Sequence, residues 1–274
     1  MRLFERFVRI AGEKIEKMDL PVLKVPGSRA LSIHFARAGG IYRRLCGDIE
    51  VKLSHRFRYI QETYEIESLK LMRRLLRSGD TAVDVGANIG LYTLIMGKLV
   101  GVGGRVCAFE PGREAFDVLC EHVALNSLCN VVETYQLLVG EEAGVEIFSE
   151  DGCKGTNRVG GSKYDGPKTK KVKRKTIRLD DFFFGCNKLP EFIKIDVEGY
   201  ELHVLRGAFN IIKVSRPTII CEVHPPLLVE IGLGWGDIQE LMATIRYDIF
   251  DFNGNIFKDF EYDKNYMILC VPME

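Results

Sequence analysis

Short apolar segments alternate with amphipathic stretches along the chain from about residue 80 onward. The apolar segments have the length of buried strands, and the stretches between them repeat apolar residues at three- and four-residue intervals, which is typical of helices. This alternation predicts an α/β fold with βα units around a mostly parallel sheet. The expected strands are 81–85, 105–110, 131–139, 192–196 and 217–223, and the expected helices are 89–100, 113–126, 199–212 and 236–244.

The alternation is interrupted once and changes near the end of the chain. Strands near 246–252 and 265–271 follow one another without a helix between them, so we expect an antiparallel hairpin at one edge of the sheet. Residues 144–178 carry strand-like pieces at 145–149 and 172–178 around a loop rich in Gly, Lys and Asn. This pattern predicts an inserted β-hairpin near the strand ends that carry the site.

The first part of the chain is predicted to be an appendage, residues 1–62, on a main domain that covers 63–274. Residues 1–18 have the spacing of a helix with one apolar face, and 49–60 suggests two short strands. A helix is expected at 64–77. An amphipathic helix on a membrane surface is the alternative for 1–18, but acidic residues dilute its polar face.

Composition places the chain among folded globular proteins. It has 274 residues, of which 46% are hydrophobic and 28% charged, and Lys plus Arg balance Asp plus Glu at 38 each. A net charge of zero gives no global attraction to nucleic acid or to an anionic membrane. The eight cysteines form no CxxC pair, charges interrupt any signal-peptide segment, and no apolar window is long enough for a membrane span. We therefore expect free thiols and a cytoplasmic location.

A glycine-rich turn follows the first strand of the main domain. Its spacing is Asp84-x-Gly86-x-x-x-Gly90, with the two glycines where a backbone would approach a ligand closely. This is not the GxGxxG of pyrophosphate-binding turns, and an acid at the strand end would repel a pyrophosphate. It suits a ligand with an ammonium group and no phosphate, such as the methionine part of S-adenosylmethionine. A purely structural turn is the alternative.

The second strand ends in Glu110, twenty residues past Gly90. Open α/β sheets present a carboxylate at this place to ribose hydroxyls. Since NAD-binding folds share the feature, Glu110 indicates a ribose-bearing cofactor without choosing between cofactors. A surface acid without a ligand is the alternative.

Titratable residues gather on two later strands. In the segment 192–199, Lys194 and Asp196 project to the same side, so a buried Lys194 would need a carboxylate partner. Asp196 and Glu198 are expected at the carboxyl end of the strand, facing the same crevice as Asp84 and Glu110. His224 ends the next strand and is a candidate general base, with a structural histidine as the alternative.

No metal site is expected, because the chain has no HxH, HExxH or CxxC signature, but His224 and the acids near it could ligate a metal and this alternative stays open. The run 168–175 contains six basic residues in eight. It is predicted to be a solvated face, and a clamp for an anionic substrate is the functional alternative.

Four stretches, taken in order, resemble the FkbM-type methyltransferases, a branch of the class I enzymes that use S-adenosylmethionine. The likeness spans 63 to 252, and the stretches are Asp84–Thr93, Ala108–Pro111, Ile177–Phe182 and Ile193–Glu201, the last followed by Val204–Gly207. The resemblance implies a Rossmann-like sheet of seven strands, S-adenosylmethionine as cofactor, and O-methylation of a sugar, polyketide or other small hydroxylated molecule. It implies cofactor-binding roles for the residues Glu65, Asp84, Gly86, Asn88, Gly90, Glu110 and Asn126.

The catalytic candidates are Asp196, Glu198 and His224, any of which could take a hydroxyl proton. The expected partner is a small acceptor, which an anionic group would also suit; neither a membrane span nor nucleic acid is expected, and a homo-oligomer stays open. Two alternatives remain at this point. One is an NAD(P)-dependent oxidoreductase, which the missing GxGxxG opposes, and the other is a non-catalytic protein that binds a polyanion through 168–175.

Overall fold

The computed structural model describes residues 39–163 and 165–274, so the helix expected at 1–18 lies outside the described residues. Its centre is a seven-stranded sheet with the order β12-β13-β11-β10-β3-β4-β5. The strands are β3 (Thr81–Val85), β4 (Arg105–Phe109), β5 (Val132–Tyr135), β10 (Phe192–Ile195), β11 (Thr218–Val223), β12 (Tyr247–Phe250) and β13 (Tyr266–Pro272).

The sheet is parallel except at one edge. Five strands, from β11 to β5 in the sheet order, pair in parallel, as expected for βα units. At the edge, β13 pairs antiparallel with both β11 and β12. These pairings confirm the mostly parallel seven-stranded sheet and its antiparallel edge hairpin.

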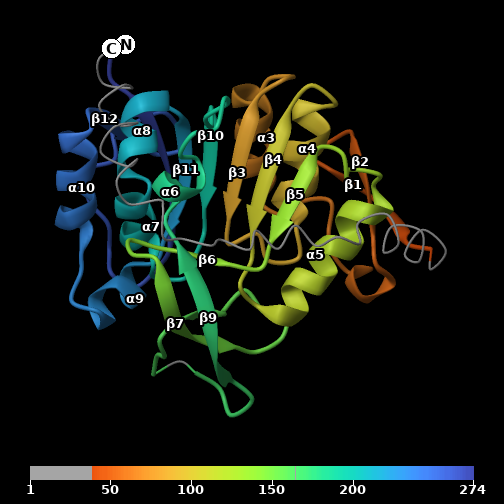
Figure 1. The fold of residues 1–274 in the computed structure, drawn as a ribbon, viewed down its shortest axis with the longest axis horizontal. Helices are drawn as coiled ribbons and strands as arrows, with labels where there is room; N and C mark the ends of the chain where they lie inside the picture. Colours follow the sequence, from red (N-terminus) through yellow and green to blue (C-terminus); the bar gives the residue numbers. More distant parts are fainter. Residues whose placement is uncertain (1–38, 164) are drawn as a thin grey trace.

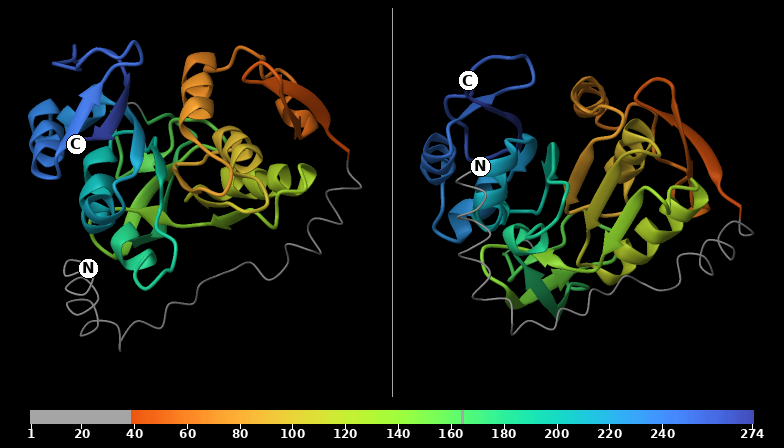
Figure 2. Two further views of the ribbon diagram at one scale, coloured as in Figure 1. Left: turned by 90° about the horizontal axis from the view of Figure 1, so that it is seen from above. Right: turned by 45° about the horizontal axis from the view of Figure 1, so that its top comes forward.

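Two groups of helices cover the two faces of the sheet, and each group has its own hydrophobic cluster (Figures 1 and 2). Alternation along β3 assigns the faces, because Ala82 packs in one cluster and Val83 and Val85 in the other. One face carries α3 (Ile66–Leu75), α4 (Leu91–Val100) and α5 (Arg113–Leu125). The other carries α6 (Leu179–Phe182), α7 (Glu201–Gly207), α8 (Phe209–Ser215) and α10 (Trp235–Thr244), while α9 (Pro225–Glu230) follows β11.

Two predicted elements are each divided in the structure. The strand expected at 131–139 is β5 followed by a separate strand, β6 (Leu138–Val139), which leaves the main sheet. The helix expected at 199–212 breaks at Ala208 into α7 and α8. Apolar periodicity marks how much of a segment is buried, but it does not mark where a strand changes sheets or where a helix changes direction.

The N-terminal hairpin begins before the segment 49–60, where both of its strands were predicted. Its strands are β1 (Ile41–Leu45) and β2 (Ile49–Leu53), and the residues after β2 form a short 3-10 helix, His55–Phe57. On β1 the half-buried Arg43 lies on the inward side and the exposed Tyr42 on the outward side, so a hydropathy pattern shows no clear alternation. Leu45, Val51 and Leu53 are buried in the cluster that also contains α4 and α5, so the hairpin packs on the main sheet's helices.

The predicted insertion is confirmed as a small second sheet with the order β6-β9-β7-β8. Its strands β7 (Gly144–Glu150) and β9 (Lys170–Ile177) are antiparallel, and β8 (Arg158–Val159) pairs with β7. Arg174 fixes it to the main domain, because the guanidinium donates to the Pro111 carbonyl at 2.6 Å and to Glu150 at 2.7 Å. In Figure 1 the insertion lies beyond the carboxyl ends of β3, β4 and β5.

Three predictions from composition have counterparts in the structure. The lysines of the basic run are exposed, mostly along β9, as a solvated strand face would be. All eight cysteines are free thiols. Within residues 39–163 and 165–274, no helix is long and apolar enough to span a membrane.

Candidate functional site

The turn after β3 is held against the neighbouring strand ends. Gly86 has a φ of +78°, and a Cβ there would lie 1.7 Å from the Asp196 carbonyl oxygen. The close approach that the glycine permits is therefore to the backbone of the strand end beside it. Gly90 likewise has a positive φ, but its Cβ position faces Leu119 on α5, so this glycine allows two helices to pack.

A cavity opens where this turn, the strand ends and the insertion meet, and we call it the first cavity. Its volume is about 580 Å³ including the open solvent at its mouth. The polar residues that line it from the main domain are Asn88, Glu110, Asp196, Glu198 and Tyr200, and those from the insertion are Lys154 and Asn157. The insertion lies close over the site, because a Cβ at Gly155 would be 3.9 Å from the Asn88 side chain.

Glu110 is a buried carboxylate at the end of β4 with a fixed orientation. Its two oxygens accept the backbone N–H groups of Asn88 at 2.8 Å and Gly112 at 2.7 Å. Burial raises the pKa of Glu110 to about 7, although both N–H groups favour the charged form. The side-chain oxygen of Asn88 is buried without a hydrogen-bond partner. Two polar groups of the first cavity thus retain capacity to bind a ligand with hydroxyl or amino groups.

Lys194 is paired as the sequence predicted. The Lys194 ammonium lies 3.0 Å from Asp196 and 3.8 Å from Asp84, and it sits 4.6 Å from the centre of the Tyr92 ring. Burial disfavours the charge, but Asp196 and Asp84 raise the pKa of Lys194 above its usual value. Asp84 is fully buried and also accepts the Thr93 hydroxyl at 2.5 Å. Asp84 therefore holds Lys194 beneath the site and does not line the first cavity.

His224 lies at the start of α9 among carboxylates. Its Nδ1 is 2.7 Å from Glu201, which is completely buried, and its Nε2 is 3.5 Å from Glu198 and 3.7 Å from Glu222. Burial opposes the charged ring, but the Glu201 hydrogen bond and the nearby acids raise the pKa of His224 to about 9. A ring that is protonated at neutral pH does not act as a general base, so this environment favours the carboxylates over His224 for that role.

Glu198 lines the first cavity and also a second cavity. This second cavity is bounded by the insertion on one side and by α9 on the other, and its wall includes Arg158, Ser162 and Tyr200. The Tyr200 and His203 rings stack at 4.2 Å along it. Burial, with Asp196 and Glu222, raises the pKa of Glu198 to about 7. Glu198 thus stands between the two cavities with a carboxyl group suited to accept a proton near neutral pH.

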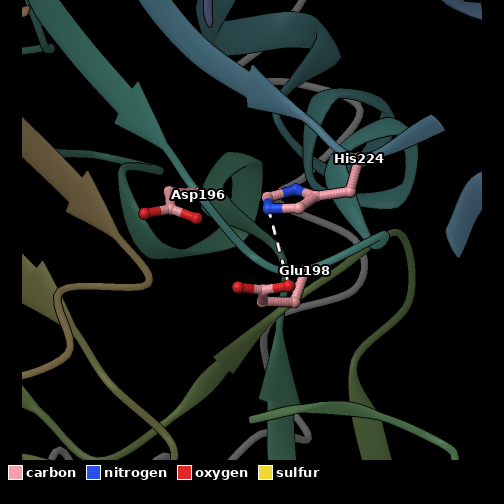
Figure 3. Close-up of side chains that lie close together, drawn as sticks. All are labelled: Asp196, Glu198 and His224. Atoms are coloured by element: carbon pink, nitrogen blue, oxygen red, sulfur yellow. Dashed lines mark ion pairs between the residues drawn. The ribbon is translucent and has the colours of Figure 1, made fainter. Parts of the chain in front are cut away.

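Asp196, Glu198 and His224, which the sequence predicted as one group, do come together (Figure 3). Four predicted cofactor residues do not line the first cavity: Asp84 and Gly90, described above, and Glu65 and Asn126. Glu65 precedes α3 and accepts the Tyr92 hydroxyl at 2.5 Å, and it does not line the first cavity. Asn126 hydrogen-bonds through its whole amide to backbone atoms of Lys52 and His122, which fixes the β2 strand on α5.

His122 has a structural role, which was the alternative for the histidines. Its Nε2 accepts the Ser54 N–H at 3.0 Å and its Nδ1 donates to the Ile89 carbonyl at 2.7 Å. Burial lowers the pKa of His122 to about 4, so the ring is neutral. The residues that sequence reasoning missed are the insertion residues of the two cavities. The only feature of the sequence that could have indicated them is the predicted position of the insertion near the strand ends.

The chain is similar in sequence to known methyltransferases. The model of the methyltransferase FkbM domain matches residues 84–252. Hexuronic acid methyltransferase AglP from Haloferax volcanii is 30% identical over 197 residues, which are 68% of this chain and 74% of that protein. Methyltransferase sdnD from Sordaria araneosa is 26% identical over 190 residues, which are 58% of this chain and 69% of that protein.

The chain is also similar to proteins of known structure. The FkbM methyltransferase from Methylobacillus flagellatus aligns with a TM-score of 0.47 and 16% identity, covering 98% of this chain and 58% of that one. The O-methyltransferase from Bacillus cereus, solved in complex with SAH, aligns with a TM-score of 0.45 and 14% identity over 98% of this chain and all of that one.

Proposed function

Given that this chain belongs to the FkbM methyltransferase family, we propose that it transfers a methyl group from S-adenosylmethionine to a hydroxyl of a small acidic sugar. Membership in this family sets the oxidoreductase alternative aside. The observation that carries the proposal is that Glu198 lines both cavities. One cavity then serves the cofactor and the other serves the acceptor, and Glu198 lies where they adjoin.

The first cavity fits the cofactor. Glu110 would hold the ribose hydroxyls, because each of its oxygens has a free lone pair besides the one that faces a backbone N–H. The unpartnered Asn88 oxygen would accept a hydrogen bond from a polar group of the cofactor. When bound, S-adenosylmethionine supplies a methyl group on a sulfonium, which needs no further activation.

The protein's own contribution is to orient the acceptor and remove its proton. Glu198 accepts the proton of the acceptor hydroxyl as the methyl group is transferred. Walls from the insertion and α9 exclude water and hold the hydroxyl in line, which supplies most of the acceleration. His224 and Lys194 keep the surrounding carboxylates in place.

The acceptor proposal rests on Arg158, which lies in the wall of the second cavity. Its side chain is 7% exposed, and its Nε is 3.6 Å from Asp165 without a hydrogen bond. The Nε donor of Arg158 thus has no hydrogen-bond partner, and a guanidinium can bind a carboxylate. The relative from Haloferax volcanii is named for a hexuronic acid, a sugar that carries such a group. We therefore assign a uronic acid, or a sugar with an equivalent carboxylate, to the second cavity.

Methyl transfer is tested with S-adenosylmethionine labelled in the methyl group and a panel of uronic acids and matching neutral hexoses. We expect labelled product with the uronic acids and its absence without the protein. Mapping the label by mass spectrometry and NMR identifies the methylated oxygen. A protein that binds S-adenosylmethionine but labels no member of the panel would contradict the acceptor class, and label found on carbon or nitrogen would contradict O-methylation.

Arg158→Gln is expected to raise the KM for a uronic acid about tenfold or more, because a charge-assisted hydrogen bond to the carboxylate is lost. The KM for a neutral hexose should change by less than about twofold, since no such bond forms with it. Because the variant leaves Asp165 without its ion pair, Arg158→Gln/Asp165→Asn serves as the folding control. An equal rise in KM for both sugars would assign Arg158 to structure alone.

Cofactor affinity is expected to be about tenfold weaker at pH 6 than at pH 8. The pKa of Glu110 is about 7, and the ionised form accepts both ribose hydroxyls while the protonated form does not. Calorimetric titration with S-adenosylmethionine at several pH values measures this slope. Glu110→Gln should bind weakly with no slope, whereas Glu198→Gln, which removes a group with a similar pKa, should keep it. A slope that persists in Glu110→Gln contradicts the assignment.

A further inference from the structure

Three side chains beside the first cavity form a set that a metal ion could use. One ligand atom from each of Asp196, Glu198 and His224 lies within 4.8 Å of the other two. Ligands bound at about 2.0–2.2 Å around one ion are roughly 3–4 Å apart, so small side-chain rotations would close the set. Figure 3 shows the three side chains converging from the ends of two adjacent strands.

The histidine is oriented as metal-binding histidines are. Glu201 accepts the Gly199 N–H at 2.8 Å and also lies 2.7 Å from Nδ1 of His224, so its position is fixed. The carboxylate on Nδ1 keeps a proton on that nitrogen, and a cation bound at Nε2, which faces Glu198, would displace the second proton of the ring. Carboxylates commonly hold the second ring nitrogen of metal ligands in this way.

Acidic side chains outnumber basic ones around these three residues. Lys194 and His224 are the two basic side chains, and the carboxylates paired with them are Asp84, Asp196, Glu198, Glu201 and Glu222. Such an excess of partly or fully buried acid is costly unless protons or a positive charge compensate it, and a bound cation would supply that charge. Lys194 hydrogen-bonds to one oxygen of Asp196, which leaves the other oxygen for an ion.

We propose that Asp196, Glu198 and His224 bind one divalent cation of the Mn²⁺ or Mg²⁺ type. The two carboxylates suit such ions, and Mn²⁺ also accepts an imidazole nitrogen. Three protein ligands leave coordination positions open, and Glu198 places them beside the second cavity. On the proposed function, two acceptor oxygens would take these positions, and the cation would polarise the hydroxyl and fix its direction. The sequence analysis expected no metal site, so this inference revises it.

Cation binding is tested on the full chain after treatment with a chelator and without S-adenosylmethionine. Mn²⁺ is titrated in, and electron paramagnetic resonance measures the free ion. We expect one Mn²⁺ per chain, with affinity reduced at least about tenfold in Glu198→Gln and in His224→Gln. Glu141→Gln, which removes a carboxylate outside the cluster, should bind as the unaltered protein does.

A spectroscopic signature identifies the imidazole ligand. Spin-echo modulation from a directly bound nitrogen should appear in the Mn²⁺ complex and disappear in His224→Gln. Because His224 is buried, thermal unfolding of the His224→Gln variant is measured to show that it is folded. Glu198 is more exposed, so Glu198→Gln gives an independent result. Competition by Mg²⁺ and Zn²⁺ ranks the ions.

The outcomes separate the cation site from the proposed function. The site would be overturned if the protein did not bind one Mn²⁺ per chain, or if Glu198→Gln and His224→Gln bound Mn²⁺ as tightly as the unaltered protein. The three residues would then form only a network of a protonated histidine and carboxylates. If methyl transfer continued at full rate in the presence of a chelator, the ion would have no role in catalysis. The proposed function would still stand. Mn²⁺ bound with the nitrogen signature, but no methyl transfer to any sugar, would support the site while overturning the proposed function.

Discussion

Replacing Glu198 with glutamine is expected to lower kcat at least about 100-fold while leaving S-adenosylmethionine affinity within about threefold. Glutamine is nearly the same size as glutamate but cannot accept the hydroxyl proton. Glu198 lies between the two cavities, and its surroundings bring its pKa to about 7, so the loss should fall on turnover. Initial rates at saturating cofactor and acceptor, with calorimetry for cofactor affinity, measure the two effects separately.

Two control variants make this result specific. Glu198→Asp keeps a carboxylate and should recover part of the activity, whereas Glu141→Gln removes an acid that pairs with Arg206 and should leave kcat unchanged. A loss of only about tenfold in Glu198→Gln would contradict a base role. Because a cation ligand at Glu198 would also lower turnover when removed, the Mn²⁺ titration described above distinguishes the two roles.

Gly86→Ala is expected to destabilise the folded state by about 3 kcal/mol or more and to impair cofactor binding. Two separate costs contribute. A residue other than glycine at a φ of +78° costs about 1–2 kcal/mol. In addition, the new Cβ would lie 1.7 Å from the Asp196 carbonyl oxygen, so β3 and β10 must move apart. A lowering of the unfolding temperature by roughly 10 °C would follow for a domain of this size.

Gly79→Ala provides the matched control. Gly79 has a φ of +94°, but nothing lies within 4 Å of its Cβ position. It should therefore show only the conformational cost, about 1–2 kcal/mol. The difference between the two variants, measured by thermal and denaturant unfolding, isolates the contact with Asp196. Equal destabilisation in both would contradict the importance of that contact.

The sheet could be predicted well from the sequence because its strands are buried on both faces. Such strands are short apolar runs bounded by turns, and β3 and β4 are found within one residue of their predicted ends. The hairpin β1–β2 could not be placed as well, because the half-buried Arg43 and the exposed Tyr42 disturb the apolar alternation of β1. Local pattern records burial, and a strand with one solvated face gives a weaker signal.

The site could be predicted in part, for the same physical reason. Asp196, Glu198 and His224 follow the ends of adjacent parallel strands, so topology alone brings them to one place. Asn126 could not be assigned in this way. Its amide could bind a ligand or cap a backbone, and only the position of β2, 74 residues away, shows that it does the latter. The insertion residues that line the two cavities could not be predicted from the sequence either, because their place depends on how a loop folds back over the main sheet.

The order of the central strands has a consequence for how the protein folds during its synthesis. β3 pairs with β4, which follows it closely in sequence, but its other neighbour, β10, begins at Phe192, 107 residues after Val85. At about 5–20 residues per second, a ribosome needs roughly 5–20 s to make the intervening chain. During that time one edge of β3 has no partner and the turn at Gly86 lacks the carbonyl that it rests on. The nascent chain should therefore depend on chaperones until β10 emerges, and the methyl-donor site should be among the last parts to form.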